Sequence, residues 1–184
     1  MTDQREQAER ALAALATAEP ASWPPVADRV REARQRAGLT TAQVAERAGL
    51  PSASDYGDLE LCDDEAFTCV SVGELHAIAA ALGSTAADLL FGETLQVPPN
   101  AADFATISGR LAERIKEERT TPDAFGGGIG WDIVEVLKKP ATLLTFNVVG
   151  FRDVCKAAGV DWIGAFLSAG GRPPNDEMQL TRHG

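Results

Sequence analysis

Apolar residues in the first half of the chain recur every three or four positions, between residues that commonly begin or end helices. Val26, Val30, Ala33 and Ala37 follow this spacing, and Gly38 comes directly after them. Residues at such intervals fall on one face of an α-helix, and glycine often follows a helix end. The pattern therefore predicts an amphipathic helix that ends at Gly38.

Further helix starts are marked by a serine or threonine followed three residues later by a glutamine or an acid. The hydroxyl of the first residue can accept a hydrogen bond from the backbone N–H of the later one, which caps a helix. Since runs of β-branched residues with a period of two are absent from the sequence, we expect an all-α protein. The predicted starts are Thr40 with Gln43, Ser52 with Asp55, Ser71 with Glu74, and Thr85 with Asp88.

The resulting order of five helices, with a short second and third helix joined by a tight turn, resembles the helix-turn-helix domain of the lambda-repressor/Cro type, the XRE-like family. The resemblance covers about residues 26–91. It is carried by residues 38–50 (GLTTAQVAERAGL), by Leu59-Glu60 and by Ser71 through Gly83. It implies a cytoplasmic, antitoxin-like transcriptional regulator whose third helix enters the major groove of DNA, usually as a dimer.

The second half of the chain repeats the pattern of the first half. We therefore expect two tandem lambda-repressor-like bundles, at residues 23–95 and 101–168. An N-terminal helix and linker at 1–22 would precede them, and a flexible tail at 169–184 would follow. The matched positions include Ile107 with Val26, Leu111 with Val30, Thr121 with Thr40, Phe125 with Val44, Gly130 with Gly49 and Phe151 with Leu75.

Charge changes this picture, because the chain has 27 acids against 17 lysines and arginines and a formal net charge of −10. Any contact with DNA would therefore need a local basic patch. Residues 52–61, which the resemblance places on the base-reading helix, contain no Arg, Lys, Asn or Gln, the side chains that usually read bases. The candidate DNA contacts are Arg29, Arg36, Arg47, Ser52, Ser54, Lys138 and Lys139.

Six acids and no base lie between Pro51 and Glu65. An unpaired acid near a phosphate costs on the order of 1 kcal/mol even in water, so several would cancel a good base contact. The spacing from Tyr56 to Glu65 resembles an acidic sub-branch of the same family, in which the loop after the third helix is lengthened. The candidate contacts to a protein partner or second subunit are Asp55, Asp58, Glu60, Asp63, Asp64 and Glu65.

Two functions follow from these features. The resemblance implies a DNA-binding regulator, and the charge favours a helix-turn-helix scaffold without DNA binding, an adaptor or immunity-type inhibitor that uses its acidic face. If Arg29, Arg36 and Arg47 cover the acids, DNA binding survives. If the acids stand free, protein binding is favoured.

The remaining chemistry is sparse. No catalytic constellation is present, so we expect no enzyme, no cofactor and no metal site. Cys62, Cys69 and Cys155 form no close pair, which favours a reducing cytoplasm and small buried fillers. The longest wholly apolar run, Ala77–Leu82, is far below the ~20 residues of a membrane span. Residues 172–182 (RPPNDEMQLTR) are similar to the translated attachment-site tails of integron gene cassettes.

Overall fold

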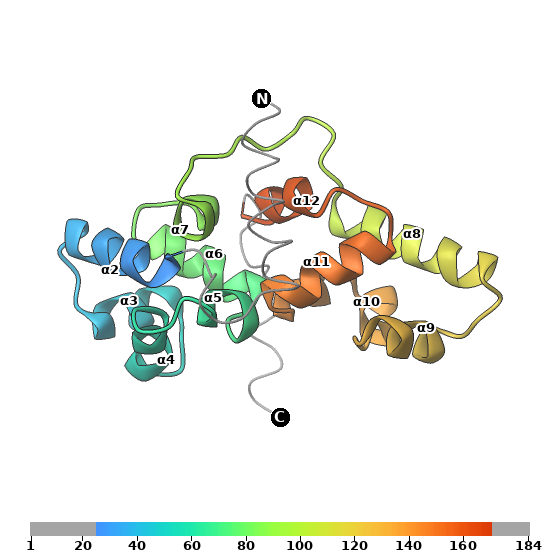
Figure 1. Cartoon of the computed structure of the whole chain (residues 1–184), viewed down its shortest axis with the longest axis horizontal. Helices are drawn as coiled ribbons and strands as arrows, with labels where there is room; N and C mark the ends of the chain where they lie inside the picture. The colour runs from blue at the N-terminus through green and yellow to red at the C-terminus, as the bar shows by residue number, and fades with distance from the viewer. Residues whose placement is uncertain (1–24, 171–184) are drawn as a thin grey trace. The chain divides into compact units, whose positions relative to one another are not determined.

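The computed structural model describes residues 25–170, which form helices and connecting loops without a strand among them (Figure 1). The all-α prediction is thus confirmed for this part of the chain. The chain divides into two compact units between Gln96 and Val97. The helix expected within residues 1–22 lies outside the described residues, and so do the cassette-like segment and nearly all of the predicted tail.

Unit 1 follows the predicted order of helices, and the side chains of Thr40, Ser52, Ser71 and Thr85 cap four of them as expected. One extra turn, α5, lies in the loop that the sequence indicated as lengthened. The elements are α2 (Val26–Arg36), α3 (Thr41–Ala48), α4 (Ala53–Leu59), α5 (Glu65–Thr68), α6 (Val72–Ala81) and α7 (Ala86–Phe91).

Helix α3 packs on α4 and α6, and α2 packs on α7. The turn from α3 to α4 passes through Gly49, whose φ of 70° lies in the left-handed region that favours glycine. Val30, Val44 and Leu59 are fully buried between these helices. Burial of one face of α4 therefore fixes which of its side chains point outward.

The helices of unit 2 follow one another in an order similar to that of unit 1. The side chains of Thr121 and Asn147 cap two of them. Gly130 ends one helix with a φ of 80°. The elements are α8 (Phe104–Glu117), α9 (Pro122–Ile129), α10 (Val134–Lys138), the 3₁₀ helix η2 (Pro140–Thr145), α11 (Val148–Ala157) and α12 (Trp162–Ala169).

Trp131 explains two of the glycines in unit 2. A Cβ atom at Gly150 would lie 2.8 Å from indole carbons of Trp131, and one at Gly126 would lie 2.5 Å from its carbonyl oxygen. Both distances are shorter than a Cβ atom tolerates in a packed protein, so glycine is needed at these two positions. Gly126 lies within α9 and Gly150 within α11.

Candidate functional site

The outer face of α4 is acidic. The Oγ atom of Ser52 accepts a hydrogen bond from the backbone N–H of Asp55 at 3.2 Å and begins the helix. Tyr56 is fully buried, as is Leu59, and the opposite side of the helix exposes Asp55 and Asp58. The helix therefore presents the carboxylates of Asp55 and Asp58 to solvent.

This face continues into the loop after α4. Asp64 is exposed there, and Leu61 is a large apolar side chain that is 75% exposed. We call Asp55, Asp58, Leu61 and Asp64 the acidic surface. The three carboxylates form no ion pair with any residue between 25 and 170.

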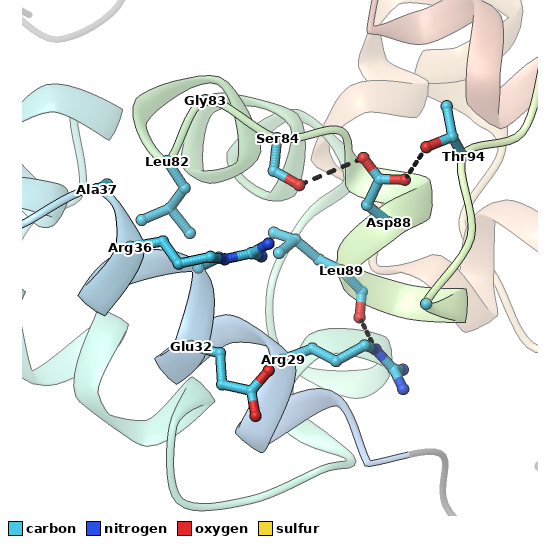
Figure 2. Close-up of a pocket in the computed structure, with 12 residues that line it drawn as sticks. Arg29, Glu32, Arg36, Ala37, Leu82, Gly83, Ser84, Asp88, Leu89 and Thr94 are labelled. Atoms are coloured by element: carbon cyan, nitrogen blue, oxygen red, sulfur yellow. Dashed lines mark hydrogen bonds between the residues drawn. The ribbon is translucent and has the colours of Figure 1, made fainter.

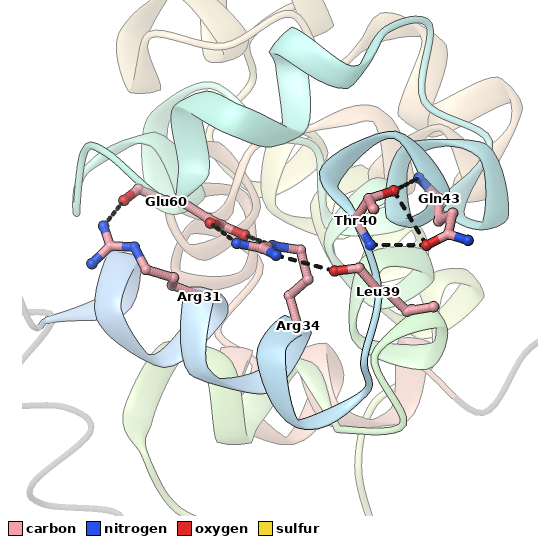
Figure 3. Close-up of polar contacts among 6 residues, drawn as sticks. All are labelled: Arg31, Arg34, Leu39, Thr40, Gln43 and Glu60. Atoms are coloured by element: carbon pink, nitrogen blue, oxygen red, sulfur yellow. Dashed lines mark hydrogen bonds and ion pairs between the residues drawn. The ribbon is translucent and has the colours of Figure 1, made fainter.

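Glu60 does not belong to this surface, which corrects its prediction as a partner contact. Its side chain points inward to Arg34 of α2 (Figure 3). The Nε atom of Arg34 donates to Oε1 at 2.5 Å, and Nη2 donates to Oε2 at 2.8 Å. Arg34 also donates through Nη1 to the carbonyl oxygen of Leu39 at 3.0 Å. One guanidinium thus joins α2, α4 and the segment that leads into α3.

The titration of the two partners follows from this geometry. Burial raises the pKa of Glu60, but the hydrogen bonds and positive charge of Arg34 outweigh it, so the pKa of Glu60 lies below its usual value. The hydrogen bond with Glu60 raises the pKa of Arg34. Both groups are therefore charged near neutral pH and form a largely buried ion pair.

Two more arginines of α2 bind backbone oxygens within unit 1. Arg31 donates to the carbonyl oxygen of Glu60 (Figure 3). It also forms an ion pair with Asp28 at 2.8 Å. Arg29 donates to the carbonyl oxygens of Leu89 at 2.7 Å and Leu90 at 2.5 Å. These arginines stabilise helix ends and do not neutralise the acidic surface.

Among the described residues of unit 1, Arg36 and Arg47 are the exposed arginines. Within residues 25–170, neither forms an ion pair. Ser54 is exposed on the first turn of α4, and Ser52 has its hydroxyl engaged as the cap. The DNA-contact candidates of unit 1 therefore include two guanidiniums without an ion pair in the described part of the chain, but Arg29 is held inside the fold.

The remaining acids near α4 have structural contacts. The Oδ1 atom of Asp63 accepts a hydrogen bond from the backbone N–H of Ala27 at 2.9 Å. This bond serves the start of α2, where Pro25 offers no capping side chain. Glu65 is half-buried as the first residue of α5. Asp63 and Glu65 are thus less available to a partner than the acids of the acidic surface.

In unit 2, Lys138 and Lys139 lie at the end of α10 and are exposed. Lys138 forms an ion pair with Glu135 at 2.7 Å, and this hydrogen bond raises its pKa. The pair lies within one helical turn, a common stabilising arrangement on exposed helices. Lys138 thus already has a partner on its own helix.

Two of the three cysteines depart from the expectation of buried fillers, and the third agrees with it. Cys62 and Cys69 are exposed on either side of α5, and Cys155 is buried in unit 2. Among the described residues, no group of three or more His, Cys, Asp or Glu side chains is arranged to hold a metal ion. None of the helices in residues 25–170 has both the length and the apolar character needed to cross a membrane.

Sequence reasoning missed the inward contacts of the arginines, although a signal was present for Arg34. It lies four residues after the buried Val30, on the same face of α2. A charged residue in line with an apolar stripe often has a buried partner. The partner itself, 26 positions away, has no local marker.

Comparison of the chain with protein-family models, with curated proteins and with solved structures finds no match.

Proposed function

We propose that unit 1 is a helix-turn-helix module that binds a basic surface of a partner protein through its acidic surface and does not read DNA bases. One observation carries this proposal. Asp55, Asp58 and Asp64 are exposed without an ion pair among the described residues, while three arginines of α2 bind inside the unit. The acids are therefore uncompensated where a DNA reader needs positive charge.

The electrostatic balance supports protein binding over base reading. Three uncompensated carboxylates near phosphates would each cost on the order of 1 kcal/mol in water. One good bidentate base contact contributes about 1–3 kcal/mol, and α4 carries no side chain suited to make it. The exposed Leu61 adds apolar area, which a protein partner can cover and a phosphate backbone cannot.

We further propose that the two units are tandem copies of one helix-turn-helix-like bundle. Three parallels support this. The second helix of each unit begins at a capping threonine, Thr40 or Thr121, and ends at a glycine with positive φ, Gly49 or Gly130. The two other parallels are the long first helices α2 and α8 and the capped helices α6 and α11.

Capture with a cross-linker tests the proposed function. The full-length protein is cross-linked to partners in extract of its host, and captured proteins are identified by mass spectrometry. A double variant, Asp58→Asn with Asp64→Asn, should lose a partner that the wild type retains. The matched control is Glu113→Gln with Glu117→Gln, which removes the same charge from exposed positions of α8. Equal capture by wild type and both variants would contradict the proposal.

A DNA-binding regulator is the second candidate. It is favoured by the exposed guanidiniums of Arg36 and Arg47, which form no ion pair within residues 25–170, and by the exposed Ser54 at the start of α4. In this case phosphate contacts from α2 and α3 would supply the affinity, with little base readout. DNA binding would weaken steeply as the salt concentration rises. Binding through a protein interface with an apolar centre would depend less on salt.

A further inference from the structure

A polar cavity of about 590 Å³ opens in unit 1 between α2, the turn from α6 to α7, and the segment after α7 (Figure 2). Cavities of a few hundred Å³ are of the size that holds small ligands. Its lining includes two arginines of α2, Arg29 and Arg36, together with Glu32, which lies between them in the sequence. The opposite wall includes Ser84, Asp88 and Thr94. We call this space the α2–α7 cavity.

Arg29 and Arg36 are the positively charged side chains in the lining of the α2–α7 cavity. Residues 48–109 contain no lysine or arginine, so the positive charge at this cavity comes from α2. Figure 2 shows both side chains extending from α2 toward α7. Arg29 is fixed by its bonds to Leu89 and Leu90, which leave Nη1 without a hydrogen bond to any described residue. Arg36 is exposed and free of an ion pair in the described part of the chain.

The carboxylate of Asp88 on the far wall is already occupied. It accepts hydrogen bonds from Thr94 Oγ1 at 2.8 Å, from the Thr85 backbone N–H at 3.3 Å and from Ser84 Oγ at 3.4 Å. Burial raises the pKa of Asp88, but these hydrogen bonds outweigh it, so its pKa is lowered. Asp88 therefore stays charged without either arginine, and its donors hold the wall in place.

We propose that the α2–α7 cavity binds a small anion, the carboxylate or phosphate group of a metabolite-sized ligand, between Arg29 and Arg36. Guanidinium groups bind both anions through paired N–H donors. Glu32 is exposed in the same lining and repels an anion. Affinity for a simple anion is therefore expected to be modest, with a Kd of about 1 mM.

Two charge variants with opposite expected effects test the site. Isotope-labelled full-length protein is titrated with inorganic phosphate and, separately, with citrate, at constant ionic strength. Amide signals of Gly83, Ser84 and Gly92 should shift and saturate. Arg36→Ala should weaken binding about tenfold. Glu32→Gln should tighten it severalfold, since it removes a like charge.

Arg47→Ala is the matched control, because it removes an equally exposed arginine from α3 and should leave the affinity unchanged. Saturation by phosphate alone would identify a phosphate ligand, and saturation by citrate would identify a carboxylate. Absence of saturable shifts at the amides of Gly83, Ser84 and Gly92 with either anion would overturn the proposal. So would an affinity that Arg36→Ala and Arg47→Ala change equally.

Discussion

The carboxylate of Glu60 receives two hydrogen bonds from the guanidinium of Arg34, from Nε at 2.5 Å and from Nη2 at 2.8 Å. This pair joins the end of α4 to α2. It orients α4 so that Tyr56 and Leu59 are buried and Asp55 and Asp58 face outward. The buried pair therefore holds α4 in the orientation that exposes the acidic surface.

Arg34→Ala should lower the free energy of unfolding of unit 1 by about 3 kcal/mol, because it leaves the Glu60 carboxylate buried without its partner. Urea denaturation followed by circular dichroism measures this loss. The control is Arg114→Ala, which breaks the exposed pair with Glu118 and should cost at most about 1 kcal/mol. Similar losses in the two variants would contradict a stabilising role for the buried pair.

The same pair predicts how stability depends on pH. The pKa of Glu60 is lower in the folded protein than its ordinary value of 4.5. A carboxyl of this kind stabilises the fold above its unfolded pKa, and the stabilisation is lost as the pH falls through the folded pKa. Wild-type stability should therefore decline below about pH 4.5.

Glu60→Gln should remove part of this decline, because glutamine does not titrate. Thermal unfolding between neutral and acid pH, with Glu118→Gln as the exposed control, measures the difference. A decline as steep in Glu60→Gln as in the wild type would show that other groups, such as Asp88 with its lowered pKa, cause the acid sensitivity.

Local features of the fold could be predicted from the sequence, and long-range contacts could not. The caps at Thr40, Ser71 and Thr85 depend on residues three positions apart, and a linear pattern displays them. Glu60 was expected on the surface because it lies in an acidic run, yet its partner Arg34 is 26 positions earlier. Such a pairing depends on how the helices pack, which no local spacing encodes.

In the candidate site too, local features could be predicted from the sequence and long-range contacts could not. The exposed acids Asp55 and Asp58 follow from the spacing of buried residues along α4, so the sequence predicted them. Arg29, by contrast, donates hydrogen bonds to the carbonyl oxygens of Leu89 and Leu90, about 60 positions later. The sequence could not predict that these bonds hold Arg29 away from a DNA-binding surface. The α2–α7 cavity likewise joins segments distant in the sequence.

Gly150→Ala should destabilise unit 2 by about 1–3 kcal/mol, because the new Cβ would lie 2.8 Å from the indole of Trp131 and overpacking in a core costs this much. Trp131 also reports on the change, since its fluorescence depends on this packing. The measurement is thermal unfolding followed by tryptophan emission.

Gly109→Ala is the matched control, in the exposed middle of α8 with open space at its Cβ position. Alanine is the better helix former, so this variant should gain about 0.5–1 kcal/mol. If Gly150→Ala caused no loss, the packing around Trp131 would differ from that described. A loss in Gly109→Ala would contradict the open space at position 109.

The thiols should differ in their reactivity with an alkylating reagent. Cys62 and Cys69 are exposed, whereas Cys155 is buried and burial raises its pKa. In the native protein, mass spectrometry should find the first two modified and Cys155 protected until denaturant is added. Rapid native modification of Cys155 would contradict the described core of unit 2.

The most direct test of the central claim is fluorescence anisotropy with labelled duplex DNA at about 50 mM and about 200 mM salt. DNA-binding proteins retain affinity for any sequence through phosphate contacts, with Kd values of about 10⁻⁴–10⁻⁶ M, so the test does not require a known operator. With its acidic surface uncompensated, the protein should show no saturable binding even at the lower salt. Saturable binding that weakens at the higher salt and with Arg47→Ala would contradict the account and establish the DNA-binding alternative.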